Sequence, residues 1–216
     1  MKNIPIIGKF LSIMALFGVF AVGSTVYATS QMSGINEGYQ AVANSSTKAA
    51  LLLTLSNRYF MALKGDVAQV VLDTDAKDNA ADAAAITADR AAYDLNMTAA
   101  EAAEPARAAD LVALAAQVNG IMDNSCAQAI KLGIAASTPA SVAADQTEYL
   151  ANCSGQFAPV VASGASLRKS FQAEADQAEA ALSAQAGTTI IMTLAIVISG
   201  LALVMLAAFA YARGEL

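Results

Sequence analysis

The feature that most constrains this chain is an uncharged apolar stretch of twenty-five residues near its C-terminal end, residues 188–212. An α-helix rises about 1.5 Å per residue, so this stretch makes a helix of roughly 37 Å, long enough to cross a hydrocarbon core of about 30 Å. Gly200 is compatible with such a helix, because in lipid no water competes for the backbone hydrogen bonds. We therefore predict a membrane-spanning helix here. The alternative is a buried core helix of a soluble protein.

A second uncharged apolar stretch lies at residues 10–30. Lys2 and Lys9 precede it, and Arg213 follows the C-terminal stretch. Because Lys and Arg are enriched on the cytoplasmic side of a membrane, we expect both termini in the cytoplasm and the 157 residues between the spans to be exported. The predicted segments are a cytoplasmic N-terminus (1–9), a first transmembrane helix (10–30), an exported domain (31–187), a second transmembrane helix (188–212) and a cytoplasmic stub (213–216).

The first apolar stretch also resembles a cleavable signal peptide. Lys2 and Lys9 would form its basic region, and the residues around Ala28 suit a cleavage site. The run is long for the apolar core of a signal peptide, however, and the helical pattern continues past Ser30 without a break. Both observations favour a retained span.

The predicted exported domain is acidic. It contains nine Lys or Arg and seventeen Asp or Glu residues, a net charge of −8. This charge disfavours nucleic acid and anionic lipid as partners. A local group of arginines could still attract a small anion, because charges act over a Debye length of about 10 Å.

The chain contains no histidine. Its absence excludes imidazole-ligated zinc, c-type haem attachment and the Ser-His-Asp and Cys-His nucleophiles. The glycine-rich phosphate-binding motifs of nucleotide-binding proteins do not occur either. We therefore expect no metal, no cofactor and no enzymatic activity.

Between the two spans, the apolar residues follow helical spacing and no alternating strand pattern occurs. The pattern and its turn residues predict a first helix running from the first span to about residue 72, followed by helices near 75–103, 105–135 and 139–187. The predicted fold class is all-α, an antiparallel up-down-up-down four-helix bundle continuous with two transmembrane helices.

A heptad seam supports each of these helices, because its positions alternate between steps of three and four residues. The first helix carries Ile35, Tyr39, Val42, Ser46, Ala49, Leu53, Ser56, Phe60, Leu63, Val67 and Val70. The third carries Leu111, Leu114, Val118, Ile121, Ser125, Gln128 and Leu132, and the fourth begins with Leu150, Cys153, Phe157 and Val160.

Side chains at the predicted turns indicate helix boundaries. Asp75 and Thr138 can cap the second and fourth helices, and Pro105 fits the first turn of the third. Pro159 lies inside the fourth predicted helix and is expected to kink it, either as a signalling hinge or as a fixed bend.

Cys126 and Cys153 are the only cysteines, and both belong to the exported, oxidising part. An antiparallel hairpin that turns near Thr138 brings them within about one helical turn of each other. This placement predicts a disulfide. The alternative is a pair of small buried thiols.

The layout resembles the four-helix-bundle sensory module of bacterial methyl-accepting chemotaxis receptors. The resemblance rests on two spans, an exported bundle, and first and fourth helices that run directly out of and into the membrane. It implies a homodimer in the bacterial inner membrane, with its sensory domain in the periplasm. It also implies a small-molecule ligand in the membrane-distal half and transmission by the fourth helix and second span.

In that family, arginines of the first helix and polar side chains of the fourth bind amino-acid or organic anions. The matching candidates are Asn57, Arg58 and Lys64 on the first helix and Asn152 and Gln156 on the fourth. Counting helix rise from each end places Arg58 at the level of residues 159–164. The alternative is that these are ordinary solvated residues of the bundle.

A second apolar stripe on the first helix, formed by Leu52, Leu55, Tyr59 and Ala62, is expected to contact the partner chain.

The sequence departs from the family at its C-terminal end. A receptor continues into a HAMP domain and a cytoplasmic signalling region, whereas this sequence ends at Leu216. Two functions are therefore considered. One is the sensory module of a chemotaxis-type receptor, from a truncated chain. The other is a free-standing, membrane-anchored helical-bundle protein that binds an exported protein partner.

Overall fold

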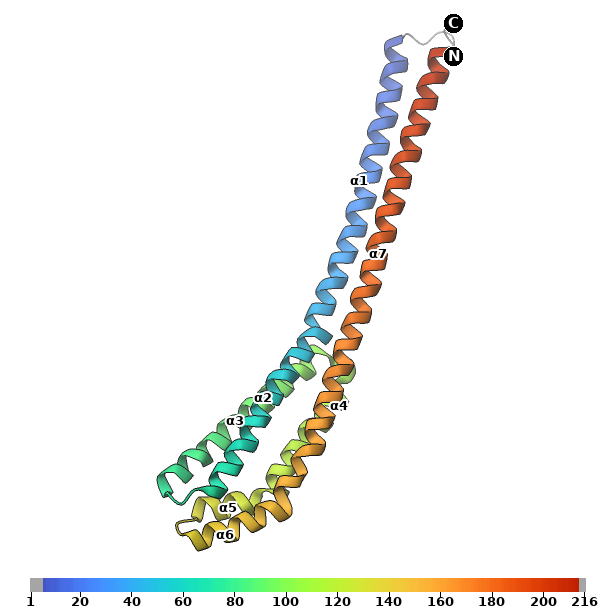
Figure 1. The fold of residues 1–216 in the computed structure, drawn as a ribbon. Helices are drawn as coiled ribbons and strands as arrows, with labels where there is room; N and C mark the ends of the chain where they lie inside the picture. The colour runs from blue at the N-terminus through green and yellow to red at the C-terminus, as the bar shows by residue number, and fades with distance from the viewer. Residues whose placement is uncertain (1–5, 214–216) are drawn as a thin grey trace. The chain divides into compact units, whose positions relative to one another are not determined.

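A computed structural model describes residues 6–213 (Figure 1). Every regular element among these residues is a helix, and none of them forms a strand, so the predicted all-α class is confirmed. The ends of the predicted cytoplasmic segments, residues 1–5 and 214–216, lie outside the described residues. The chain divides into a terminal unit, Met1–Ala41 with Gln177–Leu216, and a central unit, Val42–Asp176.

The terminal unit consists of most of α1 (Ile6–Asn44) and the last part of α7 (Phe157–Arg213). Two glycines let these helices approach closely. A Cβ on Gly38 would come within 2.4 Å of a methyl of Leu182, and one on Gly200 within 2.0 Å of the Phe20 ring. Both helices are long and apolar enough, by length and composition, to cross a membrane.

Most large apolar side chains of the terminal unit face outward. Exposed examples on α1 are Phe10, Leu16, Val19 and Val22, and examples on α7 are Ile191, Leu203, Met205 and Leu206. In water such a surface would be unfavourable, whereas in lipid it needs no protein partner.

The first half of the central unit is a helical hairpin of α2 (Ser46–Leu72) and α3 (Ala76–Ala103), which pack along each other (Figure 1). The side chain of Asp75 accepts a hydrogen bond from the Lys77 amide at 2.8 Å, which confirms the predicted cap. This cap satisfies a backbone donor that has no partner within the helix.

One prediction for this half was wrong. The expected single helix from the first span to residue 72 is interrupted at Ser45, where φ is −108° and ψ is −104°. Asn44, Ser45, Ser46 and Thr47 form a run of poor helix formers, whose side chains compete for backbone hydrogen bonds. The side chain of Ser46 instead donates to Glu104 Oε2 at 2.7 Å.

The predicted third and fourth helices are also interrupted, each by a π-helical turn. Such a turn holds one residue more than an α-helical turn and therefore shifts the buried face. The third helix consists of η1 (Pro105–Arg107), α4 (Ala108–Gly120), the π turn η2 (Ile121–Ser125) and α5 (Ala127–Ala135). The fourth consists of α6 (Pro139–Glu148), the π turn η3 (Tyr149–Cys153), the 3-10 turn η4 (Ser154–Gln156) and α7.

The π turns explain where the predicted seam fails. Up to the first residue of η2, the predicted positions Leu111, Leu114, Val118 and Ile121 are buried. From Met122, inside η2, onward, the buried positions are Met122, Cys126, Ala129 and Gly133, and the predicted Gln128 is exposed. Within η3, the predicted Leu150 is likewise exposed, and its neighbour Tyr149 packs against the core.

Pro159 does not interrupt a helix. It lies in the first turn of α7, where a proline is tolerated, and the break comes earlier, at η3 and η4. The predicted cap of the fourth helix is confirmed, since Thr138 and Ser141 form a reciprocal capping box at the start of α6.

The core of the central unit follows the seam of α2, whose positions from Ala49 to Val70 are buried as predicted. Phe60 lies at its centre, with ring centroids 6.2 Å from Tyr93 and 5.8 Å from Phe157. Burying one side chain of this size contributes roughly 1.5 to 3 kcal/mol, so the three rings strongly favour this packing.

Candidate functional site

An open groove of about 450 Å³ runs between α4 and α7 in the central unit. Its walls combine polar side chains of both helices with the apolar side chains of Leu114 and Leu167. Its volume falls in the range of small-molecule sites, roughly 300 to 1,000 Å³. The lining residues are Arg107, Asp110, Ala113, Leu114, Gln117, Ser163, Ser166, Leu167 and Ser170.

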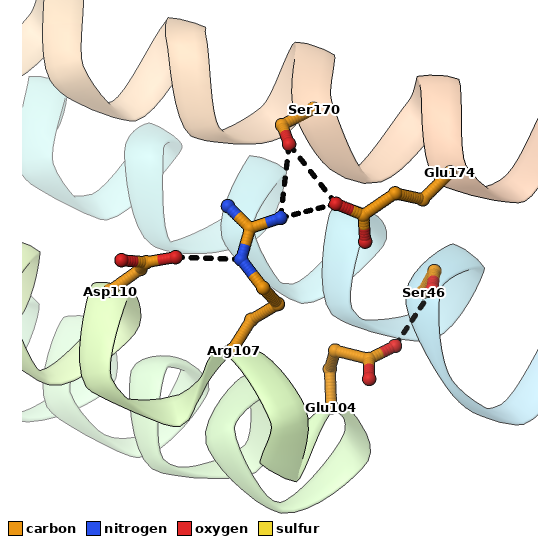
Figure 2. A network of polar contacts seen from close by, with 6 residues as sticks. All are labelled: Ser46, Glu104, Arg107, Asp110, Ser170 and Glu174. Carbon is orange, nitrogen blue, oxygen red and sulfur yellow. Dashed lines mark hydrogen bonds and ion pairs between the residues drawn. The ribbon is translucent and has the colours of Figure 1, made fainter.

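One end of the groove is organised by Arg107, the last residue of η1 (Figure 2). Its Nε donates to Asp110 Oδ2 at 2.6 Å, and its Nη1 donates to Ser170 Oγ at 3.0 Å and to Glu174 Oε1. Ser170 Oγ also donates to Glu174 Oε1, at 3.2 Å. The guanidinium carbon lies 5.3 Å from the centre of the Phe171 ring. Arg107 therefore links α4 to two successive turns of α7.

The charge of Arg107 is balanced within this network. Its hydrogen bond to Asp110 raises the pKa of the guanidinium, and Glu174 acts in the same direction. Two carboxylates thus share one cation, which leaves little attraction for a free anion. The remaining nitrogen, Nη2, makes no hydrogen bond or ion pair with the residues drawn in Figure 2 and can serve as a donor to a ligand.

A second polar cluster joins α3 to the region around the π turn η2. Arg90 donates to both carboxylate oxygens of Asp123, at 2.6 and 2.7 Å, and to Asn119 Oδ1 at 2.8 Å. Asn119 in turn donates to Asp94 at 3.1 Å. The hydrogen bonds from Arg90 hold the pKa of Asp123 below its usual value. These side chains bond one another across α3, α4 and η2, so we assign the cluster a structural role.

Of the five predicted ligand-binding residues, Asn57 lines a small cavity. This cavity lies in the core and measures about 10 Å³, about the size needed for one water molecule. Val160 and Gly164 also line it, which agrees with the register expected between the first and fourth helices.

The other four predicted residues are not gathered into one site. Arg58 and Gln156 are exposed, and Lys64 is half-buried. Asn152 is exposed and donates to Glu148 Oε1 at 2.8 Å, one turn earlier in its own chain segment. Within the described part of the chain, no hydrogen bond or ion pair joins the first-helix candidates to Asn152 or Gln156. Their ligand-binding role stays a prediction.

Sequence reasoning missed Arg107, Asp110, Ser170 and Glu174. Ser163, Ser166 and Ser170 step by three and four residues along one face of α7, a polar stripe that ends one turn before Glu174. That spacing was visible in the sequence. Its pairing with Arg107 depends on the packing of α4 against α7, which the sequence did not show.

The structure joins Cys126 and Cys153 by a disulfide, with their Cα atoms 4.7 Å apart and both residues fully buried. Among the described residues, no three His, Cys, Asp or Glu side chains are grouped to hold a metal ion. Comparison with protein-family models, curated proteins and solved structures finds no match to this chain.

Proposed function

We propose that this chain is the sensory module of a chemotaxis-type receptor in a bacterial inner membrane. In this proposal, α1 and the apolar end of α7 cross the membrane, and the central unit forms an antiparallel up-down-up-down four-helix bundle in the periplasm. A small molecule binds in the groove beside Arg107. The module works as a homodimer and passes the signal through α7 and the second span.

One observation carries the proposal. α7 is a single helix, Phe157–Arg213, that contains the groove residues Ser166 and Ser170 and also the apolar stretch that begins at residue 188. A helix is stiff along its axis, so a shift imposed on α7 at the groove can reach the far end of the same helix. The α1–α2 path is less suited to this role, because it is interrupted at Ser45.

The groove favours an uncharged, hydroxyl-rich ligand such as a polyol or a sugar. The hydroxyls of Ser163 and Ser166 and the Gln117 amide can both donate and accept hydrogen bonds, while Leu114 and Leu167 offer apolar surface to carbon atoms. Arg107 is already paired with Asp110 and Glu174, so a carboxylate ligand would gain little there. An anionic ligand would instead have to use Arg58, as the family resemblance implies.

The proposal can be tested by fusing residues 1–216 to the cytoplasmic signalling region of a bacterial chemotaxis receptor. Kinase activity is then measured while polyols, monosaccharides and organic acids are added. We expect at least one polyol or sugar to change kinase activity, and Gln117→Ala to weaken that response about tenfold, equivalent to ~1.4 kcal/mol. Gln128→Ala is the matched control, because Gln128 is exposed on α5 and does not line the groove.

Each other outcome has a defined meaning. Equal effects of the Gln117 and Gln128 substitutions would remove the groove from the mechanism. A response limited to carboxylates and abolished by Arg58→Ala would move the site to α2. If no compound acts and the purified full chain binds an exported protein, the free-standing bundle protein is the better description.

Membrane topology is tested separately. A reporter fused after Arg213 should be active only in the cytoplasm, and one inserted near Thr138 only outside. A mature N-terminus at Thr29 would instead establish a cleaved signal peptide.

A further inference from the structure

Asp145 is a fully buried carboxyl group in α6, and neither of its oxygens has a hydrogen-bond partner in the described structure. An ionised carboxylate in such a place costs several kcal/mol, since no protein group replaces the water that it loses. A protonated carboxyl avoids most of this cost and gains an O–H donor. The surroundings of Asp145 therefore decide which form the fold favours.

Asp145 lies beside Gly133 of α5, and the end of α2 lies against the same glycine. A Cβ at Gly133 would lie 2.7 Å from Asp145 Oδ2 and 2.5 Å from the carbonyl oxygen of Val70, so both oxygens lie against the same glycine. Val70 belongs to the last turn of α2. In a longer helix the Thr74 amide would donate to the Val70 carbonyl, but here this amide donates to the Asp73 side chain. The Val70 carbonyl can therefore accept from a protonated Asp145.

The charges around Asp145 also oppose its ionisation. The C-terminal end of α2 carries partial negative charge, and Glu148 lies one turn along α6. The charged groups on α5 and at the end of α2 do not offset this unfavourable effect on the ionised form. Lys131 of α5 is exposed, and the Asp73 carboxylate at the end of α2 accepts hydrogen bonds from the amides of Thr74 and Asp75.

We infer that Asp145 is a proton-binding site that fastens the end of α2 to α5 and α6. In the protonated form its O–H donates to the Val70 carbonyl. Loss of the proton removes the donor and places a negative charge against the helix end. The end of the α2–α3 hairpin then separates from α5 and α6.

Two further observations fit this inference. Burial first, and then Glu148, raises the pKa of Asp145 to about 6, so the change of charge falls within the range of pH that an exported domain meets. The disulfide joins the residue before α5 to the last residue of η3 after α6. It keeps α5 and α6 together, so the contact that opens is the one with α2.

The inference is tested on the full chain in lipid nanodiscs with its disulfide intact. Spin labels at the exposed positions Leu72 and Ile134 report the separation of α2 from α5. We expect the Leu72–Ile134 distance to increase as the pH is raised from 4.5 to 8. Asp145→Asn keeps the shape and neutrality of the protonated group, so this variant should hold the short distance at every pH.

The matched control is Asp176→Asn, an exposed aspartate on α7, which should keep the wild-type pH response. Difference infrared spectra of the unlabelled wild-type chain provide a second measurement that requires no variant. They should show one protonated carboxyl lost with a midpoint near pH 6, and Asp145→Asn should lack this signal. A pH-independent label distance in the wild type, or an equal response in Asp145→Asn, would overturn the inference. Neither result depends on a ligand in the groove, so the proposed function stands or falls separately.

Discussion

Cys126 and Cys153 are joined by a disulfide where two π-helical turns end, since Cys126 directly follows η2 and Cys153 is the last residue of η3. The Cys126 amide donates to the Ile121 carbonyl five residues earlier, at 2.8 Å. The residue after Cys153, Ser154, donates its amide in the same way to Tyr149. The extra residue in each π turn rotates the following residues, and the disulfide fastens the two helices at this point.

The disulfide should contribute substantially to stability. It closes a segment with a sequence separation of 27, for which loop-closure entropy gives roughly 3 to 4 kcal/mol. We expect the double substitution of Cys126 and Cys153 by Ser to lower the free energy of unfolding of the central unit by about this amount in denaturant titrations. Mass spectrometry of unreduced peptides should show the bond within one chain. Free thiols, or a bond between chains only, would contradict the prediction.

Gly133 should not tolerate alanine. A Cβ there would lie 2.5 Å from the Val70 carbonyl oxygen and 2.9 Å from its carbon, so backbone would have to move. We expect Gly133→Ala to lower the free energy of unfolding by about 1 to 3 kcal/mol, the usual cost of overpacking. Gly120→Ala is the control. Nothing lies within 4 Å of its added methyl, and helix propensity predicts a gain of up to ~1 kcal/mol. Equal effects of both substitutions would show that the contact is not tight.

The all-α class and most of the buried seam could be predicted because helical spacing is a local property of the sequence. Leu53, Phe60 and Leu63 face the core for that reason. The π turns could not be predicted, because nothing in the residues 121–125 or 149–153 marks the extra residue. The predicted seam is therefore wrong after residue 121. Gln128, for example, was expected to be buried and is exposed.

The groove illustrates a different limit. Arg107 lies two residues after Pro105 and has no neighbouring arginine, so the surrounding sequence does not indicate a ligand site. Its partners Ser170 and Glu174 lie 63 and 67 residues away, on a helix whose register was displaced by η3. The burial of Asp145 could not be predicted either, because it depends on the packing of α6 against α5 and the end of α2.

The stability of the central unit should depend on pH through Asp145. Its pKa is about 6 in the folded chain and 3.8 as the ordinary value, so the folded state binds the proton more tightly. This stabilisation is complete below about pH 4 and is lost as the pH rises through 6, a change of about 3 kcal/mol. Asp123, whose pKa is lowered by Arg90, acts in the opposite sense.

The contribution of Asp145 to the pH dependence of stability is therefore measured as the difference in free energy of unfolding between Asp145→Asn and the wild type. We expect the stability gap between Asp145→Asn and the wild type to grow in favour of the variant between pH 4 and pH 7. A gap that does not change with pH would contradict the prediction.

Arg107 and Arg58 should differ in their effect on stability. Arg107 bonds to Asp110, Ser170 and Glu174 and lies over Phe171, with its side chain 27% exposed. We expect Arg107→Ala to cost about 1 to 2 kcal/mol, since two carboxylates lose a shared partner and α7 loses packing. Arg58 is exposed, and its substitution by alanine should change stability by less than about 0.5 kcal/mol. Urea titrations of both variants at one salt concentration provide the comparison, and equal losses would contradict it.

Part of the stripe that was expected to contact a partner chain packs within its own chain, and we propose another face of α2 for that contact. Leu52 and Tyr59 of the predicted stripe pack against the core of their own chain, whereas Leu51 and Met61 are 59% and 45% exposed. The exposed face continues through Thr54, Arg58 and Gly65, at steps of three and four residues, which is the spacing of a helix–helix seam.

A second copy of α2 packed along this exposed face would bury these apolar side chains and bring two Arg58 side chains close together, where they could hold an anion jointly. Single cysteines at positions 51, 54, 61 and 65 should therefore cross-link in membranes to the same position of a second chain, whereas cysteines at the core-facing positions 52 and 59 should not. Cross-linking at 52 and 59 but not at 51 and 61 would restore the original stripe. The absence of cross-links along the whole of α2 would show that this helix is not the contact between subunits.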